Sequence, residues 1–176
     1  MADYTFNTTG GQTIAREMLI AYLNTGTTAL PTWSPLGAWV EDSSIEFDYQ
    51  EETTQDILGV SHTSMKKPIM TQTFDPSMLT NGDVALKEIW DDAIVNQDVQ
   101  ALCAKEILVA HLYADFGEKY DACMVKPVSL GGEGGGNVSM GYEVTYGGNR
   151  TKGAVAISGG SVTFTPESSG TSLSNP

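Results

Sequence analysis

The sequence is poor in basic residues. Its 176 residues include nine Lys and Arg but 22 Asp and Glu, so the formal net charge is −13 at pH 7. Proteins hold DNA and RNA largely through cations that neutralise phosphates. The composition therefore argues against binding nucleic acid through phosphates, and the excess of one charge favours solubility.

Cysteine and histidine each occur only twice, without the close spacing of a zinc site. Cys103 and Cys123 lie in apolar alternating runs, where buried free thiols are the preferred interpretation and a disulfide stays open. No stretch approaches the roughly 20 apolar residues of a membrane helix. The first seven residues lack the basic start and apolar run of a signal peptide. We expect a protein that is made and assembled in a cytoplasm, with no membrane partner.

The sequence also lacks the motifs of an enzyme. The glycine-rich stretch 131–136 has no Gly-Lys-Ser/Thr after it and precedes a strand, not the helix that a phosphate-binding loop needs. Ser61 and His62 are adjacent, but no orienting acid or oxyanion hole is indicated. The clustered acids lack the spacing of a calcium-binding loop. We predict no catalytic residue, no cofactor, no metal site and no enzymatic activity.

What the chain does have is an acidic strand. Ile45, Phe47 and Tyr49 alternate with polar residues over 44–50, which predicts a strand with one buried and one wet face. From residue 41 to residue 56 the chain carries seven acids and no base: Glu41, Asp42, Glu46, Asp48, Glu51, Glu52 and Asp56.

A second extended run, residues 68–74, begins after Lys66 and Lys67. Together with the acidic strand it predicts a long hairpin, whose connection over residues 52–67 we interpret as a loop. Because most hairpin loops have two to five residues, a loop of this length is expected to have a task of its own.

One helix is predicted, over about residues 83–96. Asp83 can cap it, and apolar residues recur at helical spacing. Its expected packing face consists of Leu86, Ile89, Trp90 and Ile94.

The rest of the chain reads as strands. Residues 138–146, 151–157 and 161–165 alternate and are separated by Gly pairs, which predicts a three-stranded meander. We expect an all-β or β-rich fold, a β-sandwich or barrel with one flanking α-helix and a long hairpin. Residues 1–15 would be an N-terminal arm, 16–165 the β-domain and 166–176 a flexible C-terminal tail. A hairpin that stands alone has unpaired edges, which favours packing against copies of itself.

This order of elements resembles the major tail protein, or tail tube protein, of long, non-contractile-tailed bacteriophages. The resemblance spans roughly residues 15–165 and is carried by the acidic hairpin 43–74, the helix 83–94 and the Gly-turn region 141–165. It implies a structural virion protein of the phage tail, made and assembled in the bacterial host cytoplasm, whose hexameric rings stack into a hollow tube through which DNA is ejected. It also implies as partners further copies of the chain, a tape measure protein, a tail terminator and tail-tip proteins.

The resemblance also implies roles for particular residues. The candidates to face the lumen, where acids would keep DNA from adhering, are Glu46, Asp48, Gln50, Thr71 and Thr73. The strand parity stays open, so Met70 and Gln72 are alternatives on the second arm. The candidates to contact a neighbouring subunit or ring are Asp56, Ile57, Leu58, Val60, His62, Met65, Lys66 and Lys67.

Two other functions are open. The first is the inner tube protein of a contractile tail or a secretion-like machine, which would share the hexameric tube. The second is a monomeric carbohydrate-binding β-sandwich that uses Trp33 and Trp39 as stacking platforms.

Overall fold

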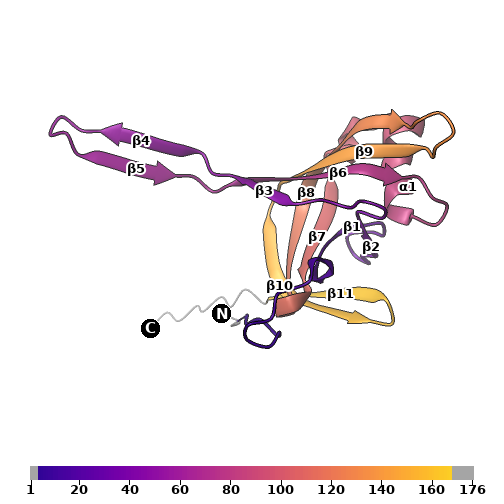
Figure 1. Ribbon diagram of the computed structural model, residues 1–176, viewed down its shortest axis with the longest axis horizontal. Coiled ribbons are helices and arrows are strands. Elements are labelled where there is room, and N and C mark those ends of the chain that lie inside the picture. The colour runs from indigo at the N-terminus through magenta and orange to yellow at the C-terminus, as the bar shows by residue number, and fades with distance from the viewer. Residues whose placement is uncertain (1–3, 168–176) are drawn as a thin grey trace.

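The computed structural model describes residues 4–167, which form a bent antiparallel sheet, a helical segment and a long two-stranded extension (Figure 1). The strands are β1 (Leu19–Asn24), β2 (Trp33–Pro35), β3 (Ile45–Asp48), β4 (Glu51–Gln55), β5 (Ser61–Met65), β6 (Ile69–Met78), β7 (Lys105–His111), β8 (Phe116–Gly131), β9 (Ser139–Tyr146), β10 (Arg150–Ser158) and β11 (Ser161–Pro166). The helical elements are α1 (Val84–Trp90), a π-helical turn (Asp91–Val95), α2 (Val99–Leu102) and two 3₁₀ turns (Arg16–Met18 and Leu112–Ala114). The β-rich class expected from the sequence is confirmed.

Nine strands form one sheet in the order β2-β1-β7-β8-β9-β6-β3, to which β10 and β11 are joined through β8. The remaining two strands, β4 and β5, pair only with each other. The centre of the sheet is β8, a strand of 16 residues. Along its length it pairs with β7, β9 and β10.

The main hydrophobic core brings α1 together with residues of β1, β6, β7, β8 and β9. Its fully buried side chains include Leu23, Ile107, Val125, Met140 and Val144. A second, smaller cluster lies on the other face of β1 and β7, where Tyr22, Leu108 and Ala110 pack against Val155 of β10. The alternation of β1 and β7 thus serves two cores, one on each face.

The predicted three-stranded meander is wrong in its first step. The hairpin of β10 and β11 forms, but β9 does not pair with β10: both run antiparallel to β8, β9 beside Met124–Gly131 and β10 beside Phe116–Tyr120. Residues 147–149 are therefore a kink along one edge of β8, not a reverse turn. Asp121 holds this kink, because its Oδ1 accepts a hydrogen bond from the backbone N of Asn149 at 2.6 Å.

The predicted helix begins as expected and then departs from the α-helical pattern. The Asp83 side chain accepts a hydrogen bond from the backbone N of Leu86 at 2.9 Å, and Leu86 and Ile89 are buried. Trp90 packs against the same core, only partly buried. Ile94, expected on this face, is instead 43% exposed. The cause is the wider π-helical turn from Asp91, which rotates later residues off an α-helical stripe. No helical pattern in the sequence predicts the short helix α2.

The predicted loop 52–67 is largely a hairpin. Glu51–Gln55 pairs with Ser61–Met65, from Glu51↔Met65 to Gln55↔Ser61. Both strands are polar on both faces, so the hydrophobic alternation that marks a half-buried strand is missing, and only the Thr-rich composition favours β-structure.

At the N-terminal end, the expected arm lies against the body of the protein. The Asn7 backbone N donates to the carbonyl of Tyr113 at 2.8 Å, and the rings of Tyr4 and Phe116 are 4.5 Å apart between centroids. Of the expected C-terminal tail, Pro166 ends β11 and residues 168–176 lie outside the described residues.

Candidate functional site

The feature that stands apart from the body is the extension, called here the ribbon and defined as residues 49–68. It prolongs the β3–β6 pair as β4 and β5 and projects well beyond the sheet (Figure 1). Every residue of β4 and β5 is exposed. An isolated two-stranded hairpin is marginally stable in water. Within residues 4–167 the ribbon therefore draws its stability from the pairing of β4 with β5 and not from a core.

A tight turn closes the ribbon. The Asp56 carboxylate accepts hydrogen bonds from the backbone N of Leu58 at 2.9 Å and of Val60 at 3.0 Å, and Gly59 takes the left-handed conformation with φ +79°. This is a type I turn followed by a left-handed glycine, for which Asp and Gly are the favoured residues. The Asp-x-x-Gly spacing was the sequence signal that could have revealed the turn.

His62 completes this turn. Its Nε2 lies 3.0 Å from Asp56 Oδ2, and this hydrogen bond is the main reason that the pKa of Asp56 is lowered. Asp56 is thus an acid beside His62, which the sequence did not indicate. Within residues 4–167 no hydrogen bond joins the Ser61 hydroxyl to His62, so the arrangement is a turn brace and not a nucleophilic triad.

The tip of the ribbon is apolar. Ile57 is 103% exposed and Leu58 is 83% exposed, and Val60 is exposed beside them. Three aliphatic residues at the end of a projecting element are fully available to another molecule. Asp56, His62, Met65, Lys66 and Lys67, the other residues expected to contact a neighbouring subunit, are exposed along the ribbon.

The ladder fixes the strand parity that the sequence left open. Glu46 pairs with Thr71, which pairs with Thr145 of β9, while Thr73 pairs with Glu143. Residues that face each other in an antiparallel pair lie on the same side of the sheet. Glu46, Asp48, Thr71 and Thr73 therefore share one side, called here the wet face.

The opposite parity on β6 belongs to the core. Gln72 is 3% exposed, where its Oε1 accepts a hydrogen bond from the Tyr146 hydroxyl at 2.5 Å and its Nε2 donates to Ser43 Oγ at 2.9 Å. Met70 packs partly buried against the same core. Gln50, expected with the wet face, lies between β3 and β4 and is exposed.

Strands β9 and β8 also contribute to the wet face, which the sequence does not predict. Glu143 and Thr145 join it through their pairing with β6, and Lys126 of β8 forms an ion pair with Glu143 at 3.0 Å. The polar positions of residues 138–146 carried this signal, but the neighbour of β9 could not be read from the sequence.

The apolar side of the acidic strand is only partly buried, contrary to expectation. Ile45 packs against the core, but Phe47 is 55% exposed and Tyr49 is 46% exposed. Their rings stack with centroids 6.4 Å apart. Apolar and polar residues do alternate here, but the segment extends beyond the edge of the core. Its last two apolar residues, Phe47 and Tyr49, are therefore not covered. Phe47 and Tyr49 thus form an uncovered apolar surface at the start of the ribbon.

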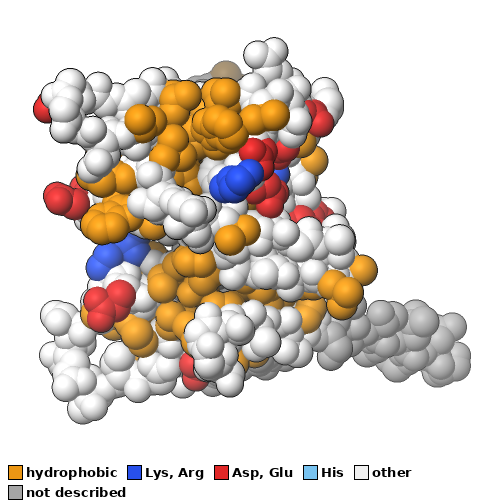
Figure 2. All heavy atoms as spheres, turned by 90° about the vertical axis from the view of Figure 1, so that its right-hand side faces the viewer, with side chains coloured by type: hydrophobic (Ala, Val, Ile, Leu, Met, Phe, Trp, Pro, Cys, Tyr) orange, Lys and Arg blue, Asp and Glu red, His pale blue; other side chains and the backbone are white. Residues whose placement is uncertain are grey.

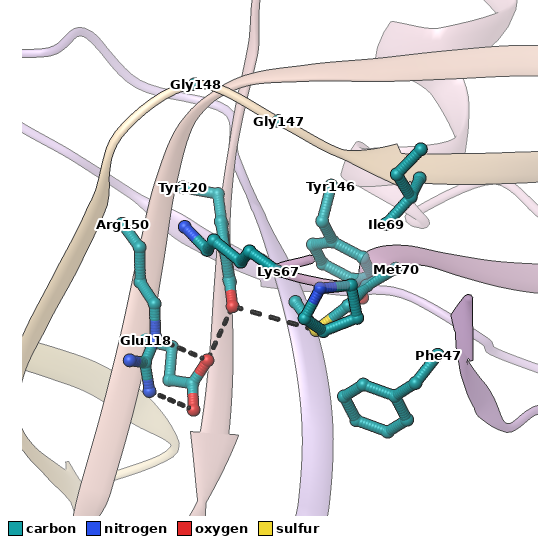
Figure 3. Close-up of a pocket in the computed structure, with 11 residues that line it drawn as sticks. Phe47, Lys67, Ile69, Met70, Glu118, Tyr120, Tyr146, Gly147, Gly148 and Arg150 are labelled. Atoms are coloured by element: carbon teal, nitrogen blue, oxygen red, sulfur yellow. Dashed lines mark hydrogen bonds and ion pairs between the residues drawn. The ribbon is translucent and has the colours of Figure 1, made fainter. Parts of the chain in front are cut away.

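A pocket of about 420 Å³ lies beside these rings, and we call it the root pocket (Figure 3). Phe47, Met70, Tyr120 and Tyr146 form its apolar walls, with Pro68 and the glycines 147 and 148, and Ile69 borders it from the wet-face side of β6. Lys67 and Arg150 line it as cations, and Glu118 as an acid.

The polar groups of the root pocket bind one another. Arg150 binds Glu118 through Nε–Oε2 at 3.0 Å and Nη2–Oε1 at 2.8 Å, and the Tyr120 hydroxyl donates to Glu118 Oε2 at 2.5 Å. Burial raises the pKa of Glu118, but the hydrogen bonds from Arg150 and Tyr120 outweigh burial and hold it below its usual range. The carboxylate is thus ionised and satisfied at neutral pH.

The far end of the molecule, opposite the ribbon, carries helix α1. Figure 2 shows this end, where hydrophobic side chains gather in patches between polar ones. The exposed apolar residues of the helical segment are Val84, Ile94, Val95 and Val99.

Within residues 4–167, no group of three or more His, Cys, Asp or Glu side chains is arranged to hold a metal ion. The helices of this part of the chain are also too short or too polar to cross a membrane. Cys103 and Cys123 are free thiols; Cys123 is buried as expected, whereas Cys103 is exposed, contrary to expectation.

The two tryptophans do not form a shared platform for a sugar. Trp33 packs partly buried against the second core cluster, whereas Trp39 is 65% exposed. Only one of the two rings thus offers an open face, and the carbohydrate-binding alternative stays a prediction.

Comparison with known proteins gives similarity in structure only. No family model matches the chain, and no curated protein matches its sequence. A chain of the PVC sheath–tube complex, from an extracellular contractile injection system in its extended state, is 11% identical; the match has a TM-score of 0.49 and covers 83% of this chain and 95% of that chain.

Two further structures are similar. The tube-terminating cap of the anti-feeding prophage is 13% identical, with a TM-score of 0.47 and coverage of 84% of this chain and 95% of that chain. The PVC sheath/tube terminator is 12% identical, with a TM-score of 0.48 and coverage of 83% and 100%. The two PVC structures belong to a contractile injection system, and none of the three is described as part of the expected non-contractile tail. At TM-scores below 0.5, the likeness is too distant to support a conclusion about assembly.

Proposed function

We propose that this chain is a structural subunit that assembles with copies of itself into stacked rings, which form the hollow tube of a phage-tail-like particle. The observation that carries the proposal is the ribbon: two paired strands with all of their side chains exposed, ending in an apolar tip. A monomer gains nothing from such an element, because its residues contribute no core. A subunit that packs it against a neighbour buries the tip and covers the unpaired strand edges.

The wet face supports a tube wall that does not retain DNA. Glu46 and Asp48 lie on one side of the sheet with Glu143, and Lys126 is paired with Glu143. We place this face toward the lumen, with Gln50, Thr71, Thr73 and Thr145 as its neutral part. Acidic side chains repel phosphates, so a nucleic acid in transit would release no counterions and would not adhere.

The chemistry of the ribbon also favours contacts between subunits over contacts with a small ligand. Its apolar residues are at an extended tip, whereas ligand sites are concave. We assign Asp56, Ile57, Leu58, Val60, His62, Met65, Lys66 and Lys67 to this contact. Exposed ion pairs of Lys66 and Lys67 would contribute only about 0–1 kcal/mol each, so the buried apolar area would supply most of the binding free energy.

The experiment that tests the proposal is electron microscopy of the purified full chain, concentrated and aged, with sedimentation velocity on the same samples. We expect rings or hollow tubes and a sedimentation coefficient that rises with protein concentration. A chain that stays monomeric at high concentration, with and without crude particle components that could initiate a tube, would refute self-assembly. Isolation of the tube from its native particle then separates the two tail types, because a co-purifying sheath protein identifies a contractile system.

A further inference from the structure

The chain carries an apolar knob and an apolar hole at opposite ends of its ribbon. The knob is the tip, with Ile57, Leu58 and Val60 exposed. The hole is the root pocket of about 420 Å³, walled by Phe47, Met70, Tyr120 and Tyr146 among others (Figure 3). Both surfaces are of aliphatic or aromatic character, and each lacks an apolar partner among residues 4–167.

The two features cannot meet within one copy. From Phe47 to Ile57 the paired chain spans about 33 Å, at roughly 3.3 Å per residue. The ribbon is held extended by the pairing of β4 with β5 and points away from the sheet (Figure 1). An occupant of the root pocket that comes from this sequence must therefore belong to a second copy.

The charges around the two features are complementary. Between residues 50 and 65 the ribbon carries Glu51, Glu52 and Asp56 and neither Lys nor Arg. The root pocket is lined by Lys67 and Arg150, in a chain with only nine such cations. Within residues 4–167, Lys67 takes part in no ion pair, whereas Arg150 is shared with Glu118. An approaching acidic ribbon thus meets Lys67, a cation at the root pocket that is not already paired within the described part of the chain.

The carboxylate in the root pocket needs no hydrogen bond from a molecule that enters it. The oxygens of Glu118 already accept hydrogen bonds from Arg150 and from the Tyr120 hydroxyl. An apolar side chain can enter without leaving these groups unsatisfied, which is the usual cost of covering polar atoms.

We propose that the tip of one copy's ribbon inserts Ile57 and Leu58 into the root pocket of a second copy. The inference rests on the proposed self-assembly and names its contact. Because knob and hole are different surfaces of the same molecule, the contact is heterologous: it adds copies in one direction and closes into a ring or continues as a helix. It also covers Phe47 at the rim.

The test is a disulfide between two tagged full-length variants, both with Cys103→Ser to remove the exposed thiol. One carries Leu58→Cys at the tip and the other carries Phe47→Cys at the rim of the root pocket. We expect the mixture, assembled and oxidised with glutathione disulfide, to give a crosslink between the two tags. The matched control replaces the second variant with Glu46→Cys, the preceding residue of the same strand, which lies on the wet face outside the root pocket; it is expected to give at least tenfold less crosslink.

Sedimentation of each variant separates the failure of this contact from the failure of assembly. If the variants assemble like the wild type without the tip-to-pocket crosslink, or Leu58→Cys pairs only with itself, the contact is wrong and self-assembly stands. If the wild type does not assemble and no crosslink forms, both proposals fall. As a second check, Ile57→Ser with Leu58→Ser is expected to abolish assembly, whereas Val95→Ser with Val99→Ser at the far end is expected to preserve it.

Discussion

At the scale of single residues, His111 links Glu118 of the root pocket to Tyr113, in the turn that follows β7. Its Nε2 is 3.6 Å from Glu118 Oε1, and its Nδ1 is 2.8 Å from the Tyr113 hydroxyl. Burial lowers the pKa of His111, and Arg150 lowers it further, although Glu118 acts in the opposite sense. The imidazole is therefore neutral in the folded chain at a pH where the unfolded chain would begin to protonate it.

These pKa directions predict a loss of stability in acid. His111 and Glu118 both have folded pKa values below their ordinary values of 6.5 and 4.5, so the unfolded state binds protons first. Stability is then complete above about pH 6.5 and falls as the pH drops toward the folded pKa of His111, and again below about 4.5 for Glu118. We expect the melting temperature to follow this course, and His111→Gln to flatten its decline between pH 7 and pH 5.

A matched control for this titration is Lys126→Gln, which removes the exposed ion pair with Glu143. Such a pair contributes about 0–1 kcal/mol, so the shape of the pH profile is expected to stay as in the wild type. A His111→Gln profile that coincides with the wild type would show that other groups govern the acid response.

At the scale of the element, the ribbon is expected to be dispensable for folding and essential for assembly. Replacing residues 52–64 with Asn-Gly leaves a short hairpin with a favoured two-residue turn. Because no side chain of β4 or β5 is buried, we expect the free energy of unfolding to change by less than about 1 kcal/mol. Thermal unfolding measures the change in the free energy of unfolding, and sedimentation velocity at high concentration measures the loss of assembly.

The control for this shortening is a change of similar kind at the β8–β9 connection, where Gly132–Gly136 is replaced by Asn-Gly at the other end of the sheet. That variant is expected to fold and to assemble. Particles of normal size from the shortened ribbon would contradict its role, and a molten or aggregated product would show that the ribbon supports the fold.

The elements also show where sequence reasoning works and where it stops. The cap at Asp83 and the burial of Leu86 and Ile89 follow from local spacing alone, and the structure confirms them. The ribbon was missed because its strands are stabilised by pairing without a hydrophobic face. The kink at residues 147–149 was misread because a Gly pair signals a turn, whereas the partner of each strand, here β8 for both β9 and β10, is a long-range property.

At the scale of the whole molecule, the distribution of charge follows the sheet. On β3, the alternation of residues alone puts Glu46 and Asp48 on the side opposite the core, as the sequence predicts. That Glu143 shares their side depends on the pairing of β6 with β9, which no local pattern reveals. The acidic character of the wet face is thus partly a property of one strand and partly of the assembled sheet.

The decisive consequence is electrostatic. If the wet face lines a lumen, Glu46→Lys together with Asp48→Lys is expected to leave the fold and the tubes intact, because both residues are exposed, but to make the tubes retain DNA. The retention should weaken steeply with salt, since binding would come from counterions released by the new cations. Co-sedimentation of tubes with DNA across a salt series measures it. The control is Glu17→Lys with Glu133→Lys, which changes the net charge equally at exposed positions outside the wet face; equal retention by both variants, or none by either at low salt, would mean that the wet face does not line the channel.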